Sequence, residues 1–328
     1  MTIRLLLLAA VITAILGTVL LILTSRPDLP SGQTLNELAW QQSFTERGQT
    51  PPPSGPREGF WGSRIDPKTY HPILEWHEPK ITDPGILEID ANGIQHYLSS
   101  QPHTHEILIV GGSVAFGAYA SSASKTYFSV LGQLLDTANL GSNIHVSGSG
   151  GWNSTKELIA ADLFSQLYNP DLIIILDGLN DLMFEPSTEP QPVSTNNPDY
   201  RPRTMRYLTN LGQIAQAAAS RQTKLLFVLQ PALFNRHRPT AIESKLLSDT
   251  LASLHQSLPD LKSSYATIST ALASLADNQS VYFLDASALF ANETHTTFTD
   301  MWHFADPGHY LLGQAIFAKV QAILTSQP

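Results

Sequence analysis

The chain contains no cysteine among its 328 residues. It therefore cannot form disulfides, bind zinc through thiolates, use a cysteine nucleophile or carry a lipid on an N-terminal cysteine. Basic residues are also few: 19 Lys and Arg stand against 28 Asp and Glu, which gives a net charge of −9. Because nucleic acid is bound mainly through positive charge, this balance and the absence of a Lys/Arg cluster argue against nucleic acid as a partner.

One long apolar run lies at the N-terminus. Residues 5–23 are almost wholly apolar, and no charge occurs between Arg4 and Arg26. A run of this length can span a bilayer as a helix. No small-x-small cleavage site follows it, which favours an uncleaved signal-anchor over the alternative of a cleaved signal. We therefore expect residues 1–25 to be a transmembrane signal-anchor, with the bulk of this single-pass protein in the periplasm or outside the cell.

Three further regions are expected after the anchor. Residues 26–58 are rich in Pro, Gly, Ser and Gln, which is typical of a tether. Residues 59–102 mix aromatic, His and Pro residues without a clear period, and we interpret them as an irregular N-terminal extension packed on the domain. Residues 103–328 carry regular apolar patterns and are long enough for one sizeable core.

The pattern of this last region predicts an α/β fold. Short apolar runs predict strands at 106–110, 143–147, 172–176, 224–229 and 281–285. Amphipathic stretches predict helices near 123–137, 154–168, 204–221, 241–276 (broken near Pro259) and from 308 onward. This alternation indicates a parallel five-stranded sheet with helices on both faces. A Pro-rich insert at 184–203 is expected to be structureless, either a substrate lid or a passive loop.

Four polar or glycine-rich segments follow predicted strands or precede the last helix, at the sheet edge where ligands bind in open α/β folds. They are Gly111-Gly112-Ser113, residues 147–154, residues 177–181 and Asp300-Met301-Trp302-His303. Acyl transfer needs a serine, a base that takes its proton, a carboxylate that orients the base, and donors for the oxyanion. Ser113, His303 and Asp300 can fill the first three roles. The N–H groups of Ser113 and Gly151 and the Asn180 amide can supply the donors.

In this order, the four segments resemble the blocks of the SGNH (GDSL-type) hydrolases over residues 105–325. The resemblance implies a flavodoxin-like three-layer α/β/α domain and ester hydrolysis or acyl transfer by a Ser–His–Asp triad. It makes Ser113 the nucleophile, His303 the general base and Asp300 the residue that orients it. It also places the oxyanion hole at Ser113, Gly151 and Asn180. The family's first block normally reads Gly-Asp-Ser, so the chain is a Gly-Gly-Ser variant.

Several alternatives remain at this stage. Ser113 on its own is a possible helix N-cap, His309 is a rival base, and Gly148 and Gly150 compete with Gly151. The chain is expected to be a membrane-tethered serine esterase. The alternatives are an O-acyltransferase acting on a glycan or lipid and a non-catalytic binding domain that retains the fold. The expected partners are an ester-containing small molecule, glycan or lipid, and the membrane through the N-terminal helix. No metal and no cofactor are expected.

Overall fold

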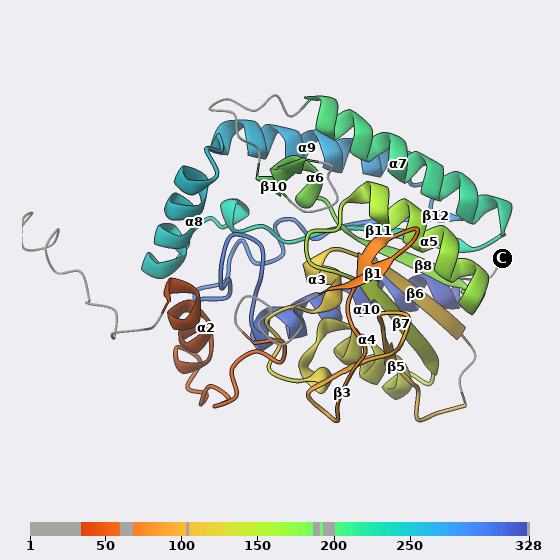
Figure 1. The fold of residues 1–328 in the computed structure, drawn as a ribbon, viewed down its shortest axis with the longest axis horizontal. Coiled ribbons are helices and arrows are strands. Elements are labelled where there is room, and N and C mark those ends of the chain that lie inside the picture. The colour runs from red at the N-terminus through yellow and green to blue at the C-terminus, as the bar shows by residue number, and fades with distance from the viewer. Residues whose placement is uncertain (1–33, 60–67, 103–104, 186–190, 193–200, 327–328) are drawn as a thin grey trace, which may run out of the picture. The chain divides into compact units, whose positions relative to one another are not determined.

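The structure of the chain is a computed structural model that describes residues 34–59, 68–102, 105–185, 191–192 and 201–326 (Figure 1). The chain divides into two units, Met1–Leu35 and Asn36–Pro328. The first unit lies almost wholly outside the described residues. The fold and the site described below belong to the second unit.

A six-stranded sheet forms the centre of this unit. Its strands are β5 (Ile94–Tyr97), β6 (His105–Gly111), β7 (Ser142–Gly148), β8 (Leu172–Asp177), β11 (Lys224–Leu229) and β12 (Val281–Asp285). Their order in space is β12-β11-β8-β6-β7-β5. Strands β6, β7, β8, β11 and β12 are parallel, and β5 pairs antiparallel with β7 at the edge. The parallel strands thus have the 2-1-3-4-5 order of flavodoxin-like folds.

Helices cover both faces of the sheet and give the three layers. On one face, α4 (Tyr127–Thr137) packs beside α10 (Asp306–Thr325). On the other, α5 (Ser154–Tyr168) contacts α7 (Arg201–Ser220), which contacts α9 (Leu258–Leu275). In Figure 1, α7 and α9 run along the upper part of the view, and α4 and α10 lie in its lower half. Because both faces are covered, β8 is buried along its whole length and reads as a continuous apolar run.

Shorter elements connect these layers. Near the carboxyl ends of the parallel strands lie α3 (Ser113–Phe116), α6 (Asn180–Met183), η2 (Ala123–Lys125) and η3 (Leu233–Asn235). Helix α8 (Ala241–Ser253) starts with a capping box in which Thr240 and Glu243 exchange hydrogen bonds. The part before β5 contains α2 (Leu35–Thr45) and the hairpins β1–β2 (Thr69–His71, Glu75–His77) and β3–β4 (Ile81–Asp83, Leu87–Ile89).

The α/β fold predicted from the sequence is confirmed, but the sheet is mixed rather than purely parallel. Each of the five predicted strands overlaps an observed one, and the predicted helices correspond to α4, α5, α7, α8–α9 and α10. The sixth strand, β5, comes from the extension 59–102. A strand of four residues is too short to show an alternation in the sequence, and it was therefore missed.

The predicted tether at 26–58 also differs from the structure. Residues 35–45 form helix α2, in which Trp40 is 2% and Phe44 is 4% exposed. Both side chains belong to one apolar cluster with Phe116 and Tyr119. The Pro-rich composition that suggested a tether is concentrated after this helix, so an average over 26–58 hid a packed element.

The predicted membrane localisation requires correction. The expected anchor, residues 1–25, lies outside the described residues. In the part of the chain that the structure describes, no helix combines the length and the apolar composition needed to cross a bilayer. This finding contradicts the predicted single-pass localisation.

The predicted insert at 184–203 lies largely outside the described residues. Its described parts are the short paired strands β9 (Phe184–Glu185) and β10 (Gln191–Pro192) and the start of α7 at Arg201. The expectation of a structureless segment is therefore wrong at these positions.

Candidate active site

Ser113 lies where the buried strand β6 turns into the short helix α3. The N-cap of α3 is Gly112, and no side chain caps this helix. The N-cap reading of Ser113 is therefore wrong. The helix ends after one turn at Gly117, which adopts φ +82°, a conformation that favours glycine. The Ser113 hydroxyl instead donates a hydrogen bond to His303 Nε2 at 2.7 Å.

His303 and Asp300 lie in the loop that precedes α10. His303 Nδ1 is 2.6 Å from Asp300 Oδ2, while Asp300 Oδ1 accepts the N–H groups of Trp302 (2.9 Å) and His303 (2.7 Å). Burial raises the pKa of Asp300, but the charge of His303 and these hydrogen bonds outweigh it, so its pKa falls below the ordinary value. An ionised carboxylate can only accept, so Nδ1 carries a proton, and in the neutral imidazole Nε2 then accepts from Ser113.

The rival base His309 lies on α10 and does not contact Ser113. Its side chain is 1% exposed, its Nε2 bonds to the Ala118 carbonyl at 2.9 Å, and its ring packs against Phe304. Burial lowers the pKa of His309 to about 3. It is therefore a neutral core residue at neutral pH.

The buried His309 predicts a pH dependence of stability. In the unfolded chain, this histidine is protonated below its ordinary pKa of 6.5, whereas in the folded chain it stays neutral down to about pH 3. Stability is therefore lost as the pH falls through this window. Between pH 7 and pH 5 the free energy of unfolding should fall by about 2 kcal/mol more in the wild type than in His309→Gln. Urea unfolding of both proteins at the two pH values measures this difference. An equal loss of unfolding free energy in the two proteins would contradict the prediction.

Asn180 lies at the start of α6, directly after the turn that ends β8. Its Nδ2 donates to the Trp152 carbonyl at 2.7 Å, which fixes the amide and leaves a second N–H on the same nitrogen. A Cβ on Gly112 would lie 2.6 Å from Asn180 Nδ2 and 3.2 Å from the Trp152 oxygen. A side chain at position 112 would therefore force the Asn180 amide to shift.

The three glycines that the sequence left as alternatives lie at the end of β7 and in the loop that follows it. Gly148 is still in β7, where it pairs with Gly111. The Gly150 N–H donates to Glu78 Oε1 at 3.3 Å. Gly151 adopts φ +80°, and no bond from its N–H to another described residue is found. The geometry therefore favours Gly151 as the donor of this loop.

A second hydrogen-bond pair ties the loops of the site together. Asp181, next to Asn180, accepts the Ser154 N–H at 2.8 Å and the Ser154 hydroxyl at 2.6 Å. Burial, together with the nearby Asp177 carboxylate, raises the pKa of Asp181 to about 6. This side chain joins α6 to the start of α5 and does not contact the Ser113–His303 pair.

Two contacts to the site were not anticipated from the sequence. The Tyr119 ring stacks on the His303 imidazole, with centroids 5.1 Å apart and planes 23° from parallel. Glu78, from the N-terminal extension, accepts the Ser149 hydroxyl at 2.7 Å beside the glycine-rich loop. Neither residue lies in a recognisable motif, and both contacts depend on how distant segments fold together.

Solved structures with a similar chain course are known at low sequence identity. An acetylxylan esterase from Geobacillus stearothermophilus, solved as a catalytic mutant, is 14% identical, with 66% of this chain and 94% of that chain covered and a TM-score of 0.47. A member of the lipolytic G-D-S-L family from Veillonella parvula is 13% identical, with 68% and 100% covered and a TM-score of 0.48. The acetyl xylan esterase AlAXEase is 13% identical, with 66% and 99% covered and a TM-score of 0.47.

The sequence itself identifies the family. No curated protein matches the chain by sequence. The profile of the GDSL-like lipase/acylhydrolase family matches residues 109–311, which is more than half of the chain. The matched region includes Ser113, Asn180, Asp300 and His303 in the order described above. The chain therefore belongs to the GDSL-like lipase/acylhydrolase family.

Proposed function

We propose that the protein is a serine esterase that cleaves carboxylic esters with Ser113 as nucleophile, His303 as general base and Asp300 as the residue that orients the base. The observation that carries the proposal is the continuous hydrogen-bonded line from the Ser113 hydroxyl through His303 to Asp300, at 2.7 and 2.6 Å. A fold kept only for binding needs no such alignment.

In this proposal, His303 Nε2 takes the hydroxyl proton as Ser113 Oγ forms a bond to the ester carbonyl carbon. The tetrahedral intermediate collapses when the bond to the alcohol oxygen breaks, and the imidazolium returns the proton to that oxygen. Water then attacks the acyl-Ser113 ester by the same sequence of steps. Asp300 stays ionised throughout and stabilises the imidazolium.

The negative charge on the carbonyl oxygen is assigned to three donors: the Ser113 N–H, the Gly151 N–H and the second N–H of Asn180 Nδ2. The bond from Asn180 to the Trp152 carbonyl supports this assignment because it sets the amide before substrate arrives. The Gly151 N–H, for which no partner among the described residues is found, and the occupied N–H of Gly150 support the choice of Gly151.

An activity-based probe tests the proposal directly. A fluorophosphonate is expected to label the folded protein once per chain, and peptide mapping is expected to place the adduct on Ser113. The same protein is expected to hydrolyse p-nitrophenyl acetate. A folded protein that neither reacts with the probe nor hydrolyses the ester would contradict the proposal and favour a binding domain.

A further inference from the structure

The segment of residues 40–58, which precedes the family match, is connected to His303 through Tyr119. Tyr119 follows α3 in the loop after Gly117 and is 4% exposed. Its backbone has φ +70°, a conformation that a bulky side chain rarely adopts. Such a conformation persists where the surroundings hold it in place.

Two side chains from the N-terminal segment hold the Tyr119 backbone. The Tyr119 N–H donates to Glu58 Oε1 at 2.5 Å, and the Tyr119 carbonyl accepts Trp40 Nε1–H at 2.9 Å. Glu58 is 3% and Trp40 is 2% exposed, so both hydrogen bonds are shielded from water. The backbone N–H and the backbone carbonyl of Tyr119 are thus both bonded to residues outside the family match at 109–311.

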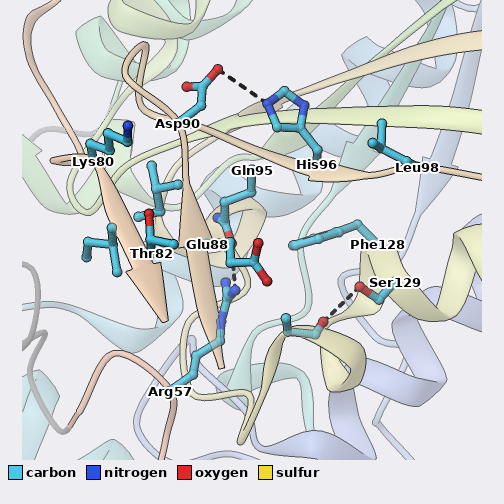
Figure 2. A pocket seen from close by; sticks show the side chains of 13 residues that line it. Arg57, Lys80, Thr82, Glu88, Asp90, Gln95, His96, Leu98, Phe128 and Ser129 are labelled. Atoms are coloured by element: carbon cyan, nitrogen blue, oxygen red, sulfur yellow. Dashed lines mark hydrogen bonds and ion pairs between the residues drawn. The ribbon is translucent and has the colours of Figure 1, made fainter. Parts of the chain in front are cut away.

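Arg57, next to Glu58, fixes the same loop from a second point. Its backbone N–H donates to the Ala120 carbonyl at 2.8 Å. Its guanidinium donates to Gln95 Oε1 at 2.6 Å and to the Phe116 carbonyl at the end of α3. Figure 2 shows the Arg57 side chain extending toward Gln95, where it lines a pocket of about 370 Å³ beside Phe128. The turn that begins with Ser113 is therefore held at its far end by the N-terminal segment.

The turn that follows α2 also contacts the loop that leads to Asp300. Arg47 donates to the Thr296 carbonyl at 2.6 Å and to Thr297 Oγ1 at 3.0 Å. Glu46 accepts the Thr296 N–H at 2.5 Å. One short N-terminal segment thus binds both the Tyr119 loop and the loop that carries Asp300 and His303.

We propose that Trp40, Arg57 and Glu58 form a clamp that sets the His303 imidazole through the stacked ring of Tyr119, so that Tyr119 is a positioning residue for the base. The inference rests on the proposed function, in which His303 is that base. A ring held face to face with the imidazole restricts its rotation about the side-chain bonds, and an aromatic face also favours the imidazolium formed during catalysis.

Replacing Tyr119 tests the clamp. Tyr119→Ala is expected to lower kcat for p-nitrophenyl acetate about 10- to 100-fold with KM little changed, because a small displacement of a catalytic group is costly. Tyr119→Phe keeps the ring and is expected to keep most of kcat. Trp40→Phe keeps an aromatic ring but lacks the N–H donor, and a loss of about three- to tenfold is expected. This milder variant decides the question if Tyr119→Ala does not fold.

Phe44→Leu is the matched control, because Phe44 packs in the same apolar cluster but donates no hydrogen bond to the loop. It is expected to lower the unfolding midpoint and leave kcat unchanged. A loss of kcat in Phe44→Leu as large as in Trp40→Phe, or full kcat in folded Tyr119→Ala, would overturn the inference.

A readout without turnover separates this inference from the proposed function. The proton on His303 Nδ1, bonded to Asp300, should give a far-downfield proton NMR signal that His303→Ala removes. Tyr119→Ala is expected to broaden or remove this signal, and Tyr119→Phe to keep it. An unchanged signal in Tyr119→Ala would overturn the clamp even if the protein proves to be an esterase. A wild type without ester hydrolysis would instead overturn the proposed function, and the signal would still decide the clamp.

Discussion

Replacing Ser113 with alanine is expected to lower kcat for p-nitrophenyl acetate by about 10⁵-fold or more. The change removes the oxygen that would form the acyl-enzyme, and the His303–Asp300 pair cannot replace it. Residual activity should come from direct attack of water on the bound ester, with the proposed oxyanion donors stabilising the charge on the carbonyl oxygen. Fluorophosphonate labelling should disappear at the same time, because the probe reacts with the same oxygen.

Ser124→Ala is the control for this variant, since Ser124 is an exposed serine of η2 that loses only a contact with Ser122. It should label and turn over as the wild type does. Circular dichroism of Ser113→Ala should match the wild type, because Ser113 does not cap α3. Labelling that survives in Ser113→Ala would mean that another nucleophile reacts and that the assignment is wrong.

The parts of the fold that the sequence predicted are those in which one local pattern determines the structure. Strand β8 is buried on both faces, so Leu172–Leu176 had to be continuously apolar, and the run was recognisable without tertiary information. The positions of Ser113 and Asn180 followed in turn, because both residues come directly after such strands. The structure brings Ser113, His303 and Asp300 together as this reasoning expected.

The parts that the sequence did not predict depend on contacts between distant segments. Helix α2 lies in a segment of polar and Pro-rich composition, and it packs Trp40 and Phe44 into a cluster that includes Tyr119. The left-handed conformation of Tyr119 has no sequence signature, since its support comes from Glu58 and Trp40. The membrane localisation was inferred from the apolar run at residues 5–23 and its flanks, and it is contradicted by the described helices, none of which is long and apolar enough to cross a bilayer.

Gly112 lies between these cases. The departure from Gly-Asp-Ser was visible in the sequence, but its reason was not. In the structure, a Cβ at this position would lie 2.6 Å from Asn180 Nδ2, so a side chain there would displace the amide. Gly112 is thus linked to the placement of the Asn180 amide, the proposed oxyanion donor.

Replacing His303 is expected to cost nearly as much as replacing Ser113. In His303→Ala the hydroxyl loses the acceptor at 2.7 Å, and kcat should fall by about 10⁵-fold because serine and base act as a unit. His309→Ala should retain kcat, since His309 bonds only to a backbone carbonyl in the core, although its stability should fall. Activity that survived His303→Ala and disappeared in folded His309→Ala would reverse the assignment of the base.

Asp300→Asn tests whether Asp300 controls the tautomer of His303 or only packs against its ring. The asparagine keeps the shape of the side chain, but its amide N–H₂ can donate to His303 Nδ1 and so favours the tautomer with the proton on Nε2. That tautomer cannot accept the Ser113 proton, and kcat should fall by about 10⁴-fold at neutral pH. The loss should shrink at high pH, where hydroxide deprotonates the serine without the base. A pH–rate profile of Asp300→Asn beside the wild type measures this, and parallel profiles would show that Asp300 does not control the tautomer.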